Sequence, residues 1–412
     1  MIHPDHSTQH AVISEEGNEQ PAARIPHEIW VLVGAAFIIA VGYGLISPII
    51  PQFLLTFGIS MGMAGLVISV FAGARLVFAP GAGWAIDKLG SRRVYLTGLF
   101  LVATTTALIA LAQEYWHIVV LRTLAGIGST MFTVSAMTLI VQLSPRKIRG
   151  RCSSAYASGF LFGSILGPVL GGLLAPLGMR VPFAIYGVVV FVAALSVWWR
   201  MPRSVGMRNV QQVQIASFTF GEAIRDRAYR LSLFSAFANG WTNFGARVAI
   251  LPLFAAAIFD NGATIAGVAL SIFAAGNAVA LQFAGKLADT IGRKPLIVSG
   301  LLLNGLATGV FGFSSQLWLF LVASVVAGFG AGLFNPAQQA VLGDVVGTQR
   351  SGGKVLANFQ MAQDFGAILS PILLGFVAEA WGFAQAYLMC GVLTVVAGLF
   401  WLAGRETLQP GE

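Results

Sequence analysis

The chain has 412 residues, of which 57% are hydrophobic and only 10% are charged, and its mean hydropathy is +0.80. This composition excludes an ordinary soluble globular protein, in which about a quarter of the residues are charged, and it indicates a polytopic membrane protein. The formal net charge is +8, which raises the question of a nucleic-acid partner.

Residues 1–27 carry several acidic, His and Gln residues and contain no apolar run of signal-peptide length. The segment therefore predicts a short disordered tail and not a targeting sequence.

Apolar runs divide the rest of the chain into about twelve segments, each close to the ~20 residues that cross a bilayer as a helix. They begin near Ile29, Met61, Val94, His117, Cys152, Pro182, Leu231, Ala263, Pro295, Trp318, Val355 and Gln385. The sequence therefore predicts an all-α membrane protein with twelve transmembrane helices.

The basic residues lie mostly in the tails and in alternate loops. The exceptions are Arg75, Arg122 and Arg247, which fall within predicted spans, and Arg180, which falls on the opposite side. This is the positive-inside pattern, and it predicts a multi-pass protein of the cell membrane with both termini in the cytoplasm. The positive charge thus orients the chain in the membrane, and we expect no nucleic-acid partner.

Residues suited to catalysis or metal binding are sparse. Cys152 lies at a predicted membrane edge and Cys390 inside the last span, so no disulfide is implied, and the five His residues lack metal-ligand spacing. We expect no metal, no cofactor and no enzymatic activity.

The fifth span contains glycines at four-residue intervals, Gly159, Gly163, Gly167 and Gly171. On a helix they form one stripe without side chains, and in lipid such a stripe lets another helix approach closely. Pro168 cannot donate a backbone hydrogen bond and is expected to bend or soften the helix there.

An internal repeat divides the chain. The loop from Gly83 to Arg93 matches the loop from Gly285 to Lys294 at an offset of 202 residues, and both contain Gly-x-x-x-Asp. The predicted divisions are a disordered tail at 1–27, a six-helix bundle at 28–200, a cytoplasmic linker at 201–230, a second six-helix bundle at 231–404 and a cytoplasmic tail at 405–412. A parallel repeat of this kind is known in membrane transporters.

Two motifs resemble those of the drug:proton antiporters of the major facilitator superfamily. The fifth-span "antiporter motif" is matched by Gly163, Gly167, Pro168, Gly171 and Gly172, and residues 42–51 resemble the first-span signature. The resemblance implies two pseudo-symmetric six-helix bundles and alternating access. It also implies that the repeated loops latch the cytoplasmic ends together, with Asp87, Arg92, Arg93, Asp289, Arg293 and Lys294 as the gating residues.

Of the 16 Asp and Glu residues, Asp364 alone is predicted to lie deep within a span. It follows Lys354 by ten residues, which at ~1.5 Å per residue places it near the bilayer midplane. An acid there is costly and indicates function. Its protonation would depend on the surrounding conformation, as a proton-coupled exchanger requires. The alternative is a permanent structural pair with Arg247.

The intramembrane arginines allow several roles. Arg122 resembles the fourth-span Arg motif that the family associates with proton translocation. Arg247 is expected either to pair with Asp364 in proton coupling or to contact an anionic cargo, and Arg75 either to contact cargo or to bind carbonyls of a neighbouring helix. The repeat requires none of these charges, because their counterparts in the other half are uncharged.

The resemblance also implies that spans one, four, seven and ten line the cavity. The residues expected to bind substrate are Tyr43, Phe132, Trp241, Asn243, Arg247, Asn335 and Gln338. A surface of aromatic side chains with a few polar points suits adaptable binding of amphipathic molecules.

We therefore expect a monomeric secondary transporter that exports a small amphipathic compound in exchange for protons across the lipid bilayer. One alternative is an exporter of an anionic metabolite or sugar-like solute that uses Arg247 and Arg75, without proton coupling. The other is a membrane sensor or scaffold that moves no cargo.

Overall fold

The computed structural model describes residues 25–144, 148–202, 220–346 and 353–408, and every regular element in these ranges is helical. The first half contains α1 (His27–Ile46), α2 (Ile50–Leu55), α3 (Met61–Leu89), α4 (Ser91–Ile109), α5 (Tyr115–Leu143), α6 (Arg149–Leu174), η2 (Ala175–Leu177) and α7 (Val181–Arg200). The second contains α8 (Phe220–Ala223), α9 (Arg227–Asn239), η3 (Gly240–Ala246), α10 (Arg247–Ile258), α11 (Gly262–Thr290), α12 (Arg293–Phe311), α13 (Leu317–Val346), α14 (Gly353–Trp381) and α15 (Phe383–Leu402).

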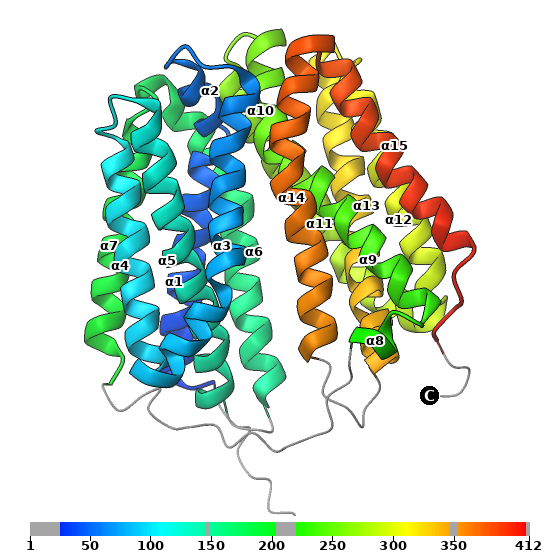
Figure 1. Cartoon of the computed structure of the whole chain (residues 1–412), viewed down its shortest axis with the longest axis horizontal. Coiled ribbons are helices and arrows are strands. Elements are labelled where there is room, and N and C mark those ends of the chain that lie inside the picture. Colours follow the sequence, from blue (N-terminus) through cyan, green and yellow to red (C-terminus); the bar gives the residue numbers. More distant parts are fainter. Residues whose placement is uncertain (1–24, 145–147, 203–219, 347–352, 409–412) are drawn as a thin grey trace, which may run out of the picture.

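The helices form two bundles that stand side by side (Figure 1). Within the described residues, 11 helical segments are long and apolar enough to cross a membrane, and α9, η3 and α10 together make one of them. The further long helix is α4, which is less apolar because it carries several threonines and begins with Ser91, Arg92 and Arg93. It packs between α5 and α7. The predicted all-α fold is confirmed.

The repeat has the same backbone geometry in both halves. Gly90 and Gly292 each precede a helix with a positive φ, 85° and 112°, a conformation that side chains other than glycine's tolerate poorly. The close crossing of α4 and α5 at Gly128 recurs at Gly330, where α12 crosses α13. The 202-residue offset therefore reflects a structural duplication.

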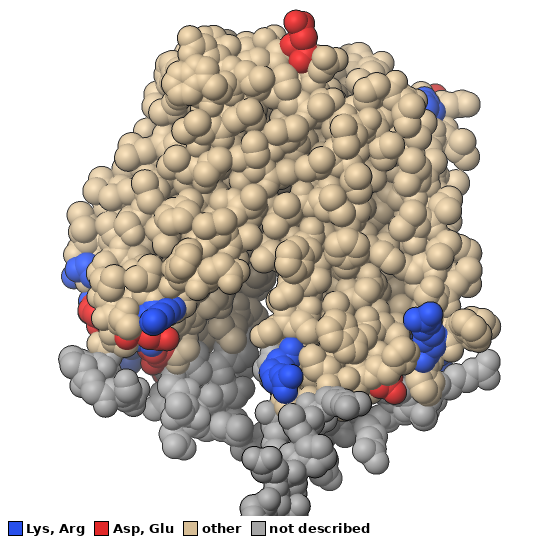
Figure 2. Space-filling view, turned by 180° about the vertical axis from the view of Figure 1, so that it is seen from behind, with Lys and Arg blue, Asp and Glu red and all other residues tan. Residues whose placement is uncertain are grey.

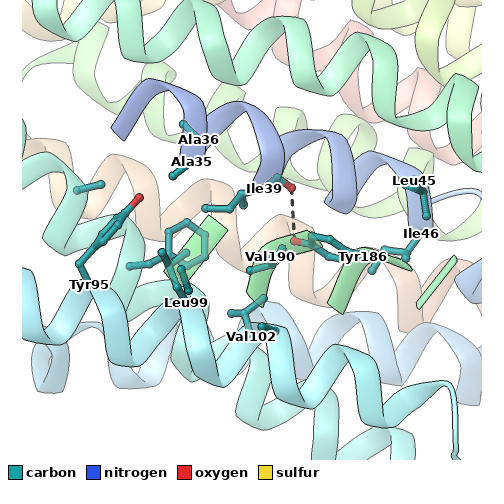
Figure 3. Packing of buried hydrophobic residues seen from close by; sticks show 14 of the residues in the cluster. Ala35, Ala36, Ile39, Leu45, Ile46, Tyr95, Leu99, Val102, Tyr186 and Val190 are labelled. Carbon is teal, nitrogen blue, oxygen red and sulfur yellow. Dashed lines mark hydrogen bonds between the residues drawn. The ribbon is translucent and has the colours of Figure 1, made fainter. Parts of the chain in front are cut away.

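The first bundle is held by a continuous apolar core between α1, α4 and α7. Figure 3 shows Leu99, Val102 and Val190 packed beneath α1, where the Tyr186 hydroxyl donates to the Ile39 carbonyl at 3.4 Å. Such an acceptor replaces the bulk water that a hydroxyl loses on burial.

The two bundles contact each other through α3 with α14 and through α6 with α11. A Cβ added at Gly65 would lie 2.0 Å from the Pro371 carbonyl oxygen, and one at Gly267 would lie 2.2 Å from that of Pro168. Each glycine thus admits the proline-bearing helix of the other half. Thr264 adds a hydrogen bond from its hydroxyl to the Gly172 carbonyl at 2.8 Å.

The glycine stripe of the fifth span contacts α1 of its own half. Gly159, Gly163, Gly167 and Gly171 lie against the backbone of α1. The motif's Pro168 carbonyl and Gly172 reach the other half, at α11. The stripe therefore fixes α6 on α1, and the proline turn, not the stripe, forms the contact between halves.

Several segment boundaries differ from the expected ones. The first span ends at Ile46 and a short helix, α2, restarts at Ile50, so the helix is interrupted around Pro48. Helix α9 begins at Arg227, inside the expected linker, because Asp226 caps its N-terminus by accepting from the Ala228 N–H at 2.8 Å. Residues 1–24, 203–219 and 409–412 lie outside the described residues.

The Gly65 contact makes a testable prediction. In Gly65→Ala the added methyl group would collide with the Pro371 backbone, so we expect a loss of about 1–3 kcal/mol in thermal unfolding of the detergent-solubilised protein. Gly73→Ala in the same helix is the matched control, because its Cβ would meet nothing within 4 Å. Equal stability of the two variants would contradict the proposed close contact.

Candidate functional site

Charged side chains gather mostly along one end of the molecule, and there the surface between the two halves is hollowed (Figure 2). We call this the basic end; its exposed cations include Lys88, Arg93, Arg200, Lys286 and Arg405. The contacts between halves described above lie toward the opposite end. The described structure is therefore open between its halves at the basic end.

Asp364 lies on α14 and its side chain is partly buried. Gln360, one turn earlier, donates from its Nε2 to Asp364 Oδ1 at 2.9 Å. Asp364 is thus an acid within a membrane span, hydrogen-bonded by a neutral amide of its own helix.

The expected alternative of a permanent Asp364–Arg247 pair is not observed. Ion pairs within the described residues involve Arg293 with Asp289 and Asp344, and Arg405 with Asp226. Asp364 is therefore free of a fixed cation partner within salt-bridge distance in this part of the chain.

The first half buries a guanidinium within a membrane span. Arg122 of α5 is 5% exposed, and its Cζ lies 4.8 Å from the ring centre of Phe71 on α3. Tyr43, which is 37% exposed, lies with its ring 6.3 Å from the same phenylalanine. The aromatic face offsets part of the cost of removing Arg122 from water.

The second half buries another guanidinium in a similar setting. Arg247 of α10 is 3% exposed, and its Cζ lies 3.8 Å from the ring centre of Phe273 and 5.5 Å from that of Phe311. Phe273 is the repeat counterpart of Phe71, at the offset of 202 residues. The two cations thus stack on equivalent phenylalanines although they come from non-equivalent helices, a relation the sequence alone did not reveal.

Arg247 is held by an amide network. Its Nε and Nη2 donate to Asn243 Oδ1 at 3.3 and 3.1 Å, and Nη2 also donates to Thr308 at 3.3 Å. Asn304 donates to the same Asn243 oxygen at 3.2 Å. Asn243 in turn donates to Asn239 at 2.8 Å. Neutral amides, rather than a carboxylate, therefore solvate this buried charge.

The network continues to the interface between the halves. Asn239 donates from its Nδ2 to Asn335 at 3.3 Å and to Gln363 at 3.4 Å. Gln363 precedes Asp364 directly in the chain. A polar path of side chains thus links the neighbourhood of Asp364 with Arg247. Asn239, Asn304 and Gln363 were not predicted from sequence, and an unusually high number of amides in predicted spans was the available indication.

The segment between α9 and α10 is wound in wide π-helical turns, from Gly240 to Ala246. Two glycines of this segment press against α14: a Cβ at Gly240 would lie 1.8 Å from the Gln363 carbonyl oxygen, and one at Gly245 would lie 2.4 Å from the Ser370 side chain. Such turns are rare and frequently occur at functional sites. Here they place Asn243 and Arg247 toward α12.

Other expected substrate residues are buried in this conformation. Phe132 is 6% exposed within the first core, and Trp241 is 7% exposed within the second. Gln338 is 1% exposed and donates to the Ser232 carbonyl at 3.0 Å and to the Ser235 hydroxyl, which ties α13 to α9. The expected residues that keep partial exposure are Tyr43, Asn243 and Asn335.

The charged residues of the first repeated loop differ in their burial. Asp87 and Arg93 are exposed. Arg92 is 8% exposed and donates to the Trp198 and Met201 carbonyls at 2.7 and 2.9 Å. Arg92 therefore ties the start of α4 to the C-terminal end of α7.

The second repeated loop is tied to the C-terminal segment. Arg293 lies 3.8 Å from Asp289 and 3.0 Å from Asp344. The Glu406 carboxylate accepts from the backbone N–H groups of Arg293 and Lys294, each at 3.0 Å, and so caps the N-terminus of α12. Glu406, at the start of the expected tail, thus binds the second half at its basic end. We call this contact the clasp.

This clasp makes a pH prediction. Partial burial disfavours the ionised Glu406 carboxylate, but backbone N–H groups from Leu408, Arg293, Lys294 and Thr407 outweigh it and hold its pKa below the usual 4.5. Because the pKa is lower in the folded state, ionised Glu406 stabilises the clasp above pH 4.5. This stabilisation is lost as the pH falls through the lowered pKa.

We therefore expect a fluorophore attached to Leu408→Cys to gain mobility as the solution is acidified, measured by anisotropy. Glu406→Gln should raise the population of the detached segment about fivefold at neutral pH and remove the acid transition. Thr407→Val is the control, because it loses only the 2.6 Å bond to Asp344 and keeps the carboxylate. An unchanged acid transition in Glu406→Gln would assign it to another group.

Comparison with known proteins agrees with this architecture. The sequence profile of the Major Facilitator Superfamily matches residues 32–245 and 232–412. The multidrug resistance protein MdtG of Dickeya zeae is 26% identical over 386 residues, which cover 90% of this chain and 92% of that protein. An uncharacterized MFS-type transporter of Methanocaldococcus jannaschii is 23% identical over 383 residues, covering 91% of this chain and 97% of its own.

Solved structures show the same fold. A bacterial homolog of the human lysosomal transporter Spinster superposes with a TM-score of 0.78 at 18% identity, covering 92% of this chain and 97% of that one. A POT family transporter in complex with 5-aminolevulinic acid superposes with a TM-score of 0.76 at 12% identity, covering 92% and 96%.

Proposed function

The chain belongs to the major facilitator superfamily, and on that premise we propose that it exports small amphipathic compounds in exchange for protons. The basic end faces the cytoplasm, in keeping with the positive-inside rule. The transporter is a multi-pass membrane protein, and its cargo and protons bind between the two halves.

The observation that carries the proposal is the position of Asp364. A partly buried acid without a fixed cation partner, in a span and at the opening between the halves, can gain and lose a proton as the halves rearrange. The similarity to MdtG, a protein named for multidrug resistance, supports a drug-like cargo.

The direct test uses purified protein in proteoliposomes. We expect an imposed pH gradient to drive accumulation of some members of a panel of amphipathic dyes and antibiotics, and a protonophore to stop it. Dye accumulation that is the same with and without the pH gradient would contradict proton exchange. Failure of every panel member, with transport of small organic acids instead, would contradict an amphipathic cargo.

A second candidate cargo is an anionic metabolite. The observation in its favour is the excess of intramembrane cations, since Arg75 is exposed on α3 while Arg122 and Arg247 are buried, one in each half. Selective loss of organic-anion transport in Arg75→Gln would support this candidate.

A further inference from the structure

Arg180 is a cation whose position the transport function does not explain. It directly precedes α7, and Arg200 at the other end of that helix belongs to the basic end. Helix α7 has 20 residues, so the two arginines lie about 30 Å apart along the axis, which is one hydrocarbon thickness. Arg180 therefore lies at the end of the molecule where the positive-inside pattern disfavours basic residues.

The guanidinium of Arg180 is anchored at the end of α4. Its Nη1 donates to the Ala110 carbonyl at 2.9 Å, and its Cζ lies 5.6 Å from the ring centre of Phe53 on α2. The side chain is exposed, and the ion pairs within the described residues do not include it. One carbonyl thus fixes the guanidinium, and in this part of the chain its other N–H groups are available to an anion.

A groove lies at the same place, between the end of α4 and the start of α5, opposite the basic end (Figure 1). Its volume is about 280 Å³, and most of its lining is apolar. The lining includes Leu108, Leu111, Trp116, His117, Val120 and Leu121. The carbonyl carbon of Ala110 is bonded to the backbone nitrogen of Leu111, so the anchored guanidinium of Arg180 lies at the groove.

Aromatic side chains mark the membrane boundary at this groove. Tyr115 and Trp116 begin α5, and Trp116 is 56% exposed while its indole N–H donates to Glu114. Such amphipathic rings are typical of the membrane interface. From Trp116 the groove follows α5 to Leu121, about 7.5 Å toward the membrane centre. Its apolar walls therefore lie at the depth of acyl chains, and Arg180 lies at the depth of lipid headgroups.

We propose that the groove binds an acyl chain of a phospholipid in the leaflet opposite the basic end, and that Arg180 binds the phosphate of the same molecule. The membrane itself supplies an apolar chain at this depth. A guanidinium matches a phosphate geometrically, because two of its N–H groups can donate in parallel. The bound phospholipid compensates the charge of Arg180 and joins α7 to α4 and α5. The site does not depend on the identity of the cargo.

The acidic residue of this loop does not compete for Arg180. Glu114 accepts from the Trp116 indole N–H and from the His117 backbone N–H, and so caps the N-terminus of α5. A carboxylate is stabilised there by the helix dipole. Its charge is thus used within α5, and the guanidinium remains free to bind a phosphate from outside the chain.

The test uses two photoactivatable probes on the delipidated full-length protein in detergent. One is a phosphatidylglycerol with a diazirine in its acyl chain, and the other is a diacylglycerol with the same chains and no phosphate. After irradiation, lipid adducts on peptides covering residues 108–121 are quantified by mass spectrometry. We expect the phospholipid to label these peptides about fivefold more than the diacylglycerol, because one arginine near a membrane surface contributes this much to headgroup binding.

Arg180→Gln should lower phospholipid labelling to the level of the diacylglycerol, and Arg180→Lys should retain most of it. Arg200→Gln is the matched control, because it removes an exposed arginine at the other end of the same helix. Val120→Trp should fill the groove and lower labelling by both probes about fivefold. Its control is Val192→Trp, which enlarges an exposed side chain of α7 outside the groove.

Three results would overturn the proposal. Equal labelling of the wild type by both probes would mean that the groove holds a chain without a phosphate contact. Loss of labelling in Arg180→Gln but not in Val120→Trp would mean that the phosphate binds while its chain lies elsewhere. A dimer that Val120→Trp dissociates, with no labelling of residues 108–121, would make a second copy of the protein the occupant of the groove.

Discussion

Replacing Asp364 by asparagine is expected to abolish transport driven by a pH gradient while leaving downhill cargo movement within about twofold of the wild type. Asparagine keeps the size of the side chain and the hydrogen bond from Gln360, but it cannot carry a proton, so the conformational change is no longer linked to the gradient. The measurement is dye accumulation in proteoliposomes with and without the gradient, beside dye efflux down its own gradient.

The matched control is Glu379→Gln. Glu379 lies on the same helix, is exposed and sits toward the opposite end, so its loss should leave both kinds of transport unchanged. Accumulation that survives in Asp364→Asn would remove this acid from proton coupling. Loss of downhill transport as well would indicate a structural role for the carboxylate.

The fold was predictable from the sequence because motifs of the first half recur at a fixed offset in the second half. The offset of 202 residues between the two Gly-x-x-x-Asp loops is a property of the chain alone, and in the structure it recurs in the backbone at Gly90 and Gly292. Span length and charge asymmetry follow from the physics of the bilayer, which leaves few choices.

The position of Asp364 was also predictable, whereas its surroundings were not. Lipid penalises an isolated charge, so one acid in an apolar span is conspicuous in any sequence. The helix of the other half that packs against α14 depends on how two distant helices cross, and that register is set by the glycine and proline contacts of the folded protein.

The substrate residues were predicted less well for a physical reason. In a soluble helix the polar face marks the exposed side, but in a membrane helix both the lipid-facing and the core-facing sides are apolar. Periodicity therefore does not separate Phe132, which is buried in the core, from Tyr43, which is partly exposed near the opening. The π-helical turns at Gly240–Ala246 arise from packing on α14, and no local propensity predicts them.

The amide network around Arg247 leads to the second large effect. Asn243 accepts hydrogen bonds from Nε and Nη2 of Arg247 and exchanges others with Asn239 and Asn304. Asn243→Ala would leave a buried guanidinium without these acceptors, and we expect a loss of about 2–4 kcal/mol in unfolding free energy. Asn335→Ala is the control, because Asn335 is partly exposed and lies at the edge of the network.

The decisive comparison is the double variant. If the cost arises from the unsolvated charge, Arg247→Met in the Asn243→Ala background should recover stability to within about 1 kcal/mol of Arg247→Met alone, because no buried cation then needs an acceptor. Thermal unfolding in detergent and a double-mutant cycle measure this coupling. Additive losses would mean that Asn243 stabilises the π-helical segment by packing, and that its amide does not stabilise the buried Arg247 charge.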